Sequence, residues 1–310
     1  MNGFRFSRET LDLPPGAFAQ GRRSILSHES APVAGFTQGT YRTYLHPLFS
    51  PDGVVVTSES PADHPHHHGV WVAADHVTVD LGVPVGHSDV ATYNFYVNDT
   101  FQGRAPGRIR EVAIEHSEID EQQIRIDQKL EWRGPAEWSN PAGRLVLKER
   151  RATTVTLTGE AVVADISSRL TALIHAVTLG PTRHALFGIR LSETLSFGGS
   201  GKLIASDGAR GADGVSGGQA NWIDYSGPAG HGQRAGVAVL PSPNNSWAPW
   251  FATDWGTIAL NPVGSTGLVI QPQESVDHAV RILAHDGLGP AALASAWEDY
   301  QQELMGERQT

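Results

Sequence analysis

The stretch Gln123-Ile-Arg-Ile-Asp-Gln-Lys-Leu-Glu-Trp132 decides the expected fold, because its apolar residues recur at every second position. Successive side chains of a β-strand point to opposite faces, so a period of two is typical of a strand with one buried face. The apolar residues that would share that face are Ile124, Ile126, Leu130 and Trp132. The polar residues between them would face water, which predicts a half-buried strand.

Similar short segments between turn residues recur along the chain, at 53–57, 69–73, 109–119, 143–158, 161–173, 222–225 and 235–240. The 34 glycines and 19 prolines suit tight turns between such strands. The stretch 196–218 is rich in glycine and serine and is expected to be a loop that could cover a site. Residues 290–305 begin with proline and continue with good helix formers, which predicts a short helix docked as a lid on the sheet edge. We therefore expect one all-β domain over residues 1–310, a large antiparallel β-sandwich with a short C-terminal helix.

Charge and composition exclude several classes of function. The net charge of -10 disfavours a nucleic-acid partner, since such binding needs a basic surface. No apolar run reaches the roughly 18 residues of a membrane-spanning helix, and the first residues lack the apolar core of a secretion signal. The chain has no cysteine, which excludes disulfides and thiolate chemistry. We expect a cytoplasmic protein without a membrane or nucleic-acid partner, and a homodimer is a possible assembly.

A histidine cluster is the most conspicuous feature, because four of the chain's 14 histidines occupy positions 64, 66, 67 and 68. In an extended segment His64, His66 and His68 would project to one face and His67 to the other. Such a wall suits general acid and base groups that titrate near neutrality, or neutral ligands of a divalent metal ion. We favour acid and base chemistry without a cofactor. The alternative is a divalent metal ion bound by His64, His66 and His68.

A carboxylate partner for these histidines is expected on a second strand. In the segment 145–149, Leu145, Leu147 and Glu149 share one face, so Glu149 points inward if the leucines do. A metal site of two histidines and a carboxylate would have Asp63, Asp75 and Glu149 as candidates. Glu149 is the predicted partner acid or base.

A second cluster is aromatic and consists of Trp222, Tyr225, Trp247, Trp250 and Trp255. It is interleaved with side chains that form hydrogen bonds: Asn221, Asp224, Asn244, Asn245 and Asp254. A sugar stacks its C–H face on flat rings while fixed polar groups bind its hydroxyls, so the combination favours a carbohydrate ligand. Trp71 and Trp250 are the tryptophans expected at the site. Signatures of nucleotide binding and of serine hydrolases are absent from the sequence.

Two long stretches resemble a known bacterial family. They comprise His46–Leu48, Ser50–Gly53 and Asp63–Trp71 early in the chain, and Asn221–Tyr225, Gly236–Val239 and Arg281–Gly287 later. The pattern resembles the family called "methane oxygenase PmoA-like" over about residues 40–290. A membrane-embedded methane oxygenase subunit needs spanning segments that this chain lacks, so methane chemistry is not carried over. The pattern is also distantly similar to the galactose-mutarotase-like β-supersandwich, which implies that fold and a sugar ligand.

These observations predict an enzyme that acts on a sugar or keto-sugar by proton transfer, of epimerase, lyase or hydratase type. The predicted catalytic residues are His66, His68 and Glu149. The predicted substrate-binding residues are His46, His64, His67, Trp71, Arg190, Asn244 and Trp250. A metal-dependent hydrolase or oxygenase and a non-catalytic carbohydrate-binding protein remain as alternatives.

Overall fold

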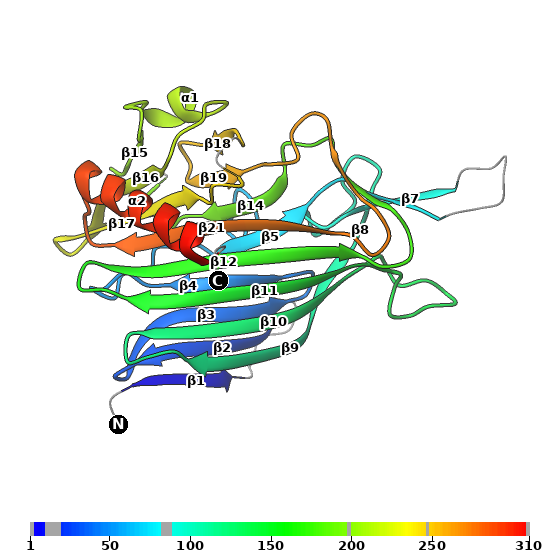
Figure 1. Cartoon of the computed structure of the whole chain (residues 1–310), viewed down its shortest axis with the longest axis horizontal. Coiled ribbons are helices and arrows are strands. Elements are labelled where there is room, and N and C mark those ends of the chain that lie inside the picture. Colours follow the sequence, from blue (N-terminus) through cyan, green and yellow to red (C-terminus); the bar gives the residue numbers. More distant parts are fainter. Residues whose placement is uncertain (1–2, 10–19, 82–88, 197–199, 246–247, 308–310) are drawn as a thin grey trace.

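Two eight-stranded sheets pack face to face and form the body of the protein (Figure 1). The computed structural model describes residues 3–9, 20–81, 89–196, 200–245 and 248–307. The first sheet has the order β1 (Phe4–Glu9), β2 (Gln20–His28), β3 (Ala31–Gly39), β4 (Thr43–Leu48), β5 (Val70–Ala74), β14 (Ala185–Arg190), β19 (Thr257–Leu260) and β18 (Trp250–Ala252). The second has the order β15 (Lys202–Ala205), β16 (Ile223–Gly230), β17 (Gln233–Pro241), β21 (Ser275–His285), β12 (Ala161–Ala172), β11 (Leu145–Leu157), β10 (Gln123–Arg133) and β9 (Arg108–Glu118). The predicted all-β sandwich is confirmed.

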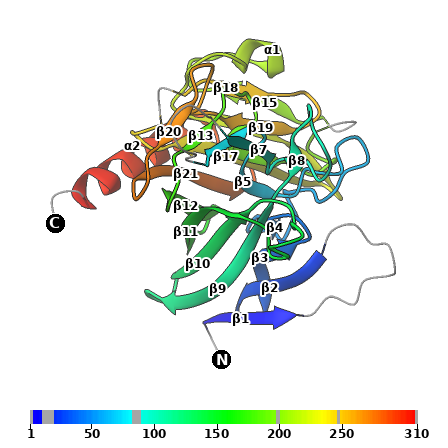
Figure 2. The same cartoon turned by 90° about the vertical axis from the view of Figure 1, so that its right-hand side faces the viewer.

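A smaller five-stranded sheet lies at one end of the sandwich (Figure 2). Its order is β20 (Leu268–Ile270), β13 (Val177–Leu179), β6 (Val77–Asp80), β7 (Val90–Asn94) and β8 (Ala105–Pro106). The pairing is antiparallel except between β7 and β8, which run parallel. The chain leaves β5 for β6, β7 and β8 of this sheet, runs through β9 to β12 of the second large sheet, and returns through β13 of the small sheet to β14. The small sheet thus lies on both sides of this excursion between two neighbouring strands of the first sheet.

The stretch that decided the expected fold is strand β10. Its four alternating apolar side chains, Ile124, Ile126, Leu130 and Trp132, are each at most 1% exposed, and Lys129 between them is exposed. The prediction for this strand is therefore confirmed. Residues 53–57 form no strand of their own and join the first sheet only through single bridges, such as the one between Thr57 and Leu191.

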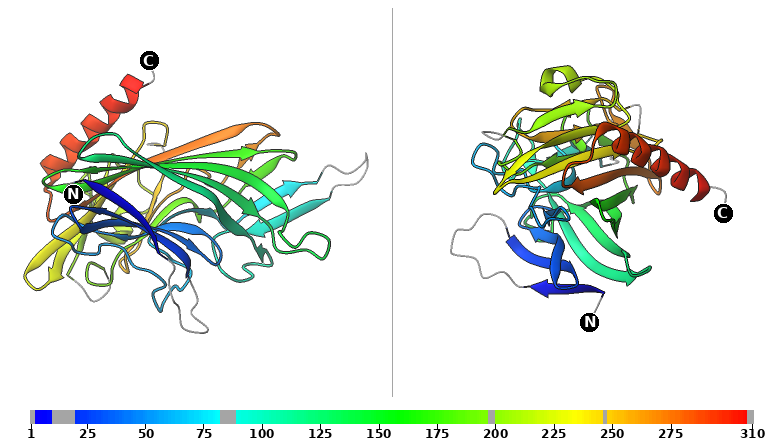
Figure 3. Two further views of the ribbon diagram at one scale, coloured as in Figure 1. Left: turned by 90° about the horizontal axis from the view of Figure 1, so that it is seen from below. Right: turned by 90° about the vertical axis from the view of Figure 1, so that its left-hand side faces the viewer.

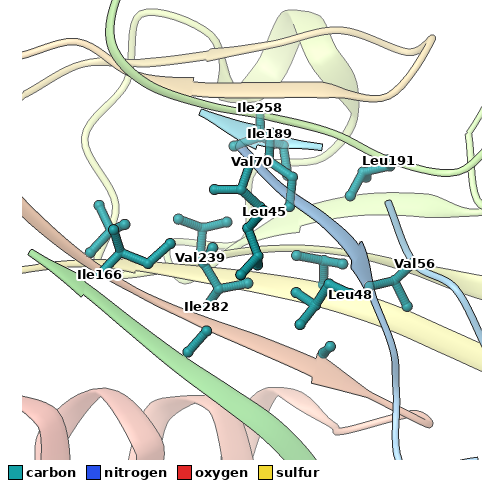
Figure 4. Packing of buried hydrophobic residues seen from close by; sticks show 14 of the residues in the cluster. Leu45, Leu48, Val56, Val70, Ile166, Ile189, Leu191, Val239, Ile258 and Ile282 are labelled. Carbon is teal, nitrogen blue, oxygen red and sulfur yellow. The ribbon is translucent and has the colours of Figure 1, made fainter. Parts of the chain in front are cut away.

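The main core fills the space between the two large sheets (Figure 4). The first sheet contributes Leu45, Val70, Ile189 and Ile258, and the second contributes Ile166, Val239 and Ile282. All seven are at most 6% exposed. Because side chains alternate along a strand, the neighbours of Val70 and Ile189 point to the opposite face of the first sheet. That outer face holds the candidate site.

The C-terminal helix α2 (Pro290–Glu307) packs on a sheet face rather than on a sheet edge. Leu293 and Tyr300 are buried against residues of the central strands β12, β17 and β21, among them Val163, Leu240 and Leu283. Figures 1 and 3 show the helix lying across these strands. The helix is confirmed, but its expected place on the edge was wrong, since the outward apolar residues that it covers belong to the middle of the sheet. In the described part of the chain, no helix combines the length and apolarity needed to cross a membrane.

The glycine-rich stretch 196–218 is more ordered than expected, apart from residues 197–199, which lie outside the described residues. It contains β15 and the short helix α1 (Gly211–Val215). The N–H of Gly217 donates to the carbonyl of Trp250, and Ser216 Oγ donates to the carbonyl of Ala252. The expectation of a plain loop was wrong because these backbone groups complete the edge of the first sheet at β18.

Candidate functional site

Three strand ends meet on the outer face of the first sheet and carry the candidate site. The start of β5 lies beside the end of β14, with Val70 opposite Ile189. The end of β14 lies beside the start of β19, with Arg190 opposite Thr257. His67 and His68 directly precede β5, and Trp255 directly precedes β19, so the antiparallel order brings three distant segments together.

The histidine segment is a turn and not an extended strand. The N–H of His64 donates to the carbonyl of Pro61 at 3.1 Å, and the N–H of His67 donates to that of His64 at 2.9 Å. The ring of His64 consequently lies parallel to the ring of His67, with centroids 4.9 Å apart. The expectation that His64, His66 and His68 form one wall was therefore wrong. Gly69 ends the turn with φ +50, where an added Cβ would lie 2.1 Å from the carbonyl oxygen of Leu45.

A stack of flat rings crosses the site from the surface inward. The half-exposed Trp255 lies parallel to His64 at 4.2 Å between centroids, and His64 lies parallel to His67. His67 in turn stacks on the buried Trp71 at 5.0 Å. The Nε2 atom of His67 is 2.8 Å from the hydroxyl oxygen of Tyr96, and this contact holds the His67 ring in its position on Trp71.

His68 and His46 occupy the other side of the turn. His68 stacks on Tyr44 at 4.8 Å, and its Nδ1 atom is 3.1 Å from Ser60 Oγ. The hydroxyl of Tyr44 donates to Glu59 Oε1 at 2.6 Å. His46 Nδ1 lies 2.9 Å from Thr57 Oγ1. Burial lowers the pKa of His46 to about 4, against the opposing effect of the nearby Glu59 carboxylate.

His66, His67 and His68 of the turn are neutral at physiological pH. Burial, followed by the positive charge of Arg42, lowers the pKa of His66 to about 3 and that of His68 well below its usual value. Burial, followed by the neighbouring His66, also holds the pKa of His67 far below the usual range. Neutral imidazoles with such low pKa values are weak bases, but a neutral ring can donate one N–H. The ring nitrogens of His67 and His68 already face protein groups, so His66 is the ring that can donate to a substrate oxygen.

Two buried arginines flank the turn. Arg42 Nη2 donates to Asn98 Oδ1 at 2.5 Å, and burial lowers the pKa of Arg42 to about 10. Arg190 Nη2 donates to both oxygens of Asp63, at 2.8 and 2.9 Å, while its guanidinium carbon lies 4.7 Å from the ring centroid of Trp255. Both arginines are 1% exposed. The site therefore combines neutral imidazoles with two cations.

A carboxylate and a histidine that the sequence did not pair lie next to this cluster. Asp75 is 2% exposed, and its Oδ2 is 3.1 Å from His184 Nδ1. His184 stacks on Tyr96 at 5.1 Å between centroids, and Tyr96 also contacts His66 at 5.4 Å. A buried carboxylate on one ring nitrogen orients an imidazole and stabilises its protonated form. Asp75 was a candidate carboxylate in the sequence, whereas no pattern pointed to His184 or Tyr96.

The arrangement does not suit the predicted metal site. Among the described residues, no group of three His, Asp or Glu side chains could hold a metal ion. The Nδ1 atom of His64 faces Asp63, and His68 is bonded to Ser60 and lies against Asn98. His64 and His66 lie 5.7 Å apart between ring centroids, whereas His68 lies on Tyr44, so the geometry of the described residues does not support a metal site of this trio.

Seven of the ten predicted site residues come together here, namely His46, His64, His66, His67, His68, Trp71 and Arg190. Glu149 is not among them. It is buried on the inward face of β11, where it accepts hydrogen bonds from Trp132 Nε1 at 2.7 Å, Arg151 Nε at 2.7 Å and Ser168 Oγ at 2.8 Å. The inward carboxylate was predicted correctly, but the residues that it contacts belong to the second sheet.

The other two predicted residues also lie apart from the turn. Trp250 is 2% exposed in the main core, and its Nε1 donates to the carbonyl of Ala220. Asn244 is exposed and lines a groove of about 890 Å³ on the outer face of the second sheet. Trp247 lies outside the described residues. The tryptophan of the aromatic cluster that does reach the histidines is Trp255.

A glycine beneath the site gives the first prediction. A Cβ added to Gly188 would lie 2.4 Å from ring carbons of Trp71, which supports His67. We expect Gly188→Ala to lower the free energy of unfolding by about 1–3 kcal/mol, because the crowded ring must move. In urea unfolding, the control Gly159→Ala should change the same quantity by less than about 0.5 kcal/mol, since its Cβ meets open space. Equal effects of the two substitutions would contradict the tight contact.

The fold and the site together define a class: an all-β sandwich protein with a buried cluster of histidines, tyrosines and arginines on the outer face of one sheet. The chain belongs to the family described as a family of unknown function, DUF6807, whose model matches residues 23–298. No curated protein matches the chain significantly.

Several solved structures are distantly similar. The Slr1438 protein from Synechocystis sp. PCC 6803 has 11% identity and a TM-score of 0.33, with 90% of this chain and 98% of that one covered. A putative kojibiose phosphorylase from human microbiome has 9% identity and a TM-score of 0.32, covering 99% of this chain and 36% of that one. A polysaccharide lyase has 11% identity and a TM-score of 0.26, covering 98% and 34%. This chain thus spans about a third of the length of the last two, whose names are those of carbohydrate enzymes.

Proposed function

We propose that the histidine turn and its neighbours form the active site of an enzyme that moves a proton on a carbohydrate, of epimerase, lyase or hydratase type. The observation that carries the proposal is the pair Asp75 and His184, joined to the histidine turn through the ring of Tyr96. A histidine oriented by a buried carboxylate is a suitable general base. This revises the roles expected from the sequence, because the base is His184 and not His66 or His68.

The remaining groups fit the chemistry of a carbonyl substrate. His184 would remove the proton next to the carbonyl through Nε2, since Nδ1 faces Asp75. Nε2 accepts an N–H from the exposed Arg183 at 3.3 Å, and the substrate would displace this contact. The carbonyl oxygen then gains negative charge, and the neutral His66 can stabilise it by donating an N–H, as oxyanion-binding groups do. Trp255 offers a half-exposed ring on which a sugar face can stack.

The test is proton exchange in D2O with a panel of keto-sugars, followed by NMR. We expect at least one of them to exchange a C–H proton. With that sugar, His184→Gln and Asp75→Asn should each reduce the rate about 10²–10⁴-fold, the usual contribution of a general base. Asp277→Asn on the exposed face of β21 is the matched control and should leave the rate unchanged.

The outcomes separate the candidate functions. Binding of a sugar without exchange of any proton would favour a non-catalytic carbohydrate-binding protein. Exchange that persists in both His184→Gln and Asp75→Asn would refute the assigned base. Circular dichroism of each variant shows whether a loss of rate reflects the fold or the chemistry.

A further inference from the structure

Arg42 is a buried cation whose hydrogen bonds include no carboxylate. Of its five N–H groups, those on Nη2 face the amide oxygen of Asn98, while Nε and Nη1 are buried and have no partner among the described residues. A buried guanidinium without an opposite charge is strongly unfavourable, and proteins ordinarily pair such a group.

The other buried arginines follow that rule. Arg151 donates to Glu149 at 2.7 Å, and Arg281 donates to Asp165 at 2.6 Å. Arg190 donates to Asp63, although its Nε and Nη1 also lie buried without partners. Arg42 therefore differs from these arginines, because no described residue supplies an anion to it.

The surroundings of Arg42 suit a ligand rather than a structural role. Its charge acts on His66, His67 and His68, whose pKa values burial lowers, so these rings add no charge. Both ring nitrogens of His67 and of His68 already face protein groups, which leaves the N–H of His66 for a ligand. Tyr44 and Tyr96, the other neighbours that affect it, are polar but uncharged. Together these side chains form a positive, donor-rich site next to the half-buried ring of His66.

We propose that the active site binds a carbohydrate that carries a carboxylate, with the carboxylate paired to Arg42 and its ring placed toward Trp255. The inference rests on the proposed function for its carbohydrate part, whereas the anion follows from the arginine itself. The charge balance selects the kind of anion. Since Asp63 already neutralises Arg190, one positive charge is left, which matches a carboxylate and falls short of a phosphate with nearly two negative charges. A planar guanidinium also matches a carboxylate with two parallel hydrogen bonds.

Asp63 gives the proposal an additional consequence. Its side chain is 43% exposed, and it occupies Arg190 Nη2 from the solvent side. Without Asp63, Arg190 would become a second cation without an opposite charge, beside the same His67 that Arg42 affects. Replacement of Asp63 by a neutral residue should therefore strengthen the binding of an acidic sugar.

The test measures binding separately from turnover, by isothermal titration calorimetry of the whole chain. D-galacturonate and D-glucuronate are compared with their neutral parents D-galactose and D-glucose and with a hexose phosphate. We expect a uronate to bind more tightly than its neutral parent and than the phosphate. Arg42→Met should weaken uronate binding at least about tenfold, whereas Asp63→Asn should strengthen it. Arg169→Met, which removes an exposed ion pair of β12, is the control and should leave the affinity for uronates unchanged.

Thermal unfolding distinguishes a ligand-binding role from a structural one. Without ligand, Arg42→Met should leave the melting temperature unchanged or raise it, because it removes an unpaired buried charge. A lowered melting temperature with unchanged uronate affinity would overturn the proposal, as would equal binding of uronates and their neutral parents. Uronate binding that depends on Arg42, without any C–H exchange, would refute only the proposed catalysis. Exchange on neutral keto-sugars without uronate binding would refute only the carboxylate.

Discussion

Acidification from about pH 7 to about pH 5 is expected to lower the free energy of unfolding by about 10 kcal/mol, the sum over five buried histidines. Burial lowers the pKa of His46, His66, His67, His68 and His278 in the folded protein. The unfolded chain binds protons on these side chains below its histidine pKa of about 6.5, whereas the folded protein does not until the pH approaches about 4 or lower. Stability is thus fully present above about pH 6.5 and is lost as the pH falls, by roughly 2 kcal/mol for each such histidine down to pH 5.

The carboxylates of the site do not change this sign. The pKa values of Asp63 and Asp75 are lowered, so both stay ionised over this range of pH and contribute equally at its two ends. Urea unfolding at several pH values measures the effect. A free energy of unfolding that is the same at pH 7 and at pH 5 would contradict the burial of neutral histidines.

A single histidine can be used to check the size of the effect. His278 lies fully buried on β21, with no hydrogen-bond partner for either ring nitrogen among the described residues, and burial lowers its pKa to about 4. His278→Leu should therefore reduce the loss between pH 7 and pH 5 by about 2 kcal/mol. His116→Gln, on an exposed position of β9, is the matched control and should leave the loss unchanged.

Removal of Arg151 is expected to destabilise the fold by about 3–5 kcal/mol, because it leaves Glu149 as an unpaired charge between the sheets. Arg151 and Glu149 have side chains 6% and 0% exposed, and they are 2.7 Å apart. Trp132 and Ser168 would still donate to the carboxylate, but neither carries a charge. Urea unfolding of Arg151→Met and of the unchanged protein measures this difference in the free energy of unfolding.

Two further variants separate the unpaired charge from simple loss of contact. The double variant Glu149→Leu with Arg151→Met should regain most of the lost stability, since it removes both charges. Arg169→Met breaks an ion pair of similar length with Asp277, but there both side chains are more than half exposed, so less than about 1 kcal/mol is expected. If Arg151→Met cost no more than Arg169→Met, Glu149 would not be the buried charge described.

The sequence pattern predicted the strands that have one buried face and one solvent-exposed face. Strands β9, β10, β11 and β12 begin and end within two residues of the expected segments. Their alternation is a local property, readable without any knowledge of the partner strand. The strands of the first sheet gave less signal: β5 was predicted as 69–73, but β3 was not, because seven consecutive residues of β3 are buried and show no alternation.

Part of the site was predicted as well, because a cluster of neighbouring residues is also a local property of the chain. Histidines that stand together in the chain stay together in space, so a cluster at positions 64 to 68 survives any fold. Residues that join it from other strands could not be identified: Trp250 was chosen although Trp255 is the ring at the site, and Glu149 was chosen although Asp75 holds the nearby histidine. Trp250 lies in β18 and Trp255 in the turn after it, and the sequence alone does not show which of the two rings the fold brings to the histidines.

By itself, then, the sequence determined an all-β sandwich, its C-terminal helix and a polar centre built on His64, His66, His67 and His68, because periodicity and local composition are properties of the chain. Only the tertiary structure decided how those histidines act. Burial lowers the pKa of His66, His67 and His68, and the turn stacks His67 on His64 while His68 lies on Tyr44. The pairing of β14 with β5 and β19 adds Arg190, and Arg42 joins from the residue before β4. Burial and charge depend on what packs around a side chain, and that information lies in distant segments.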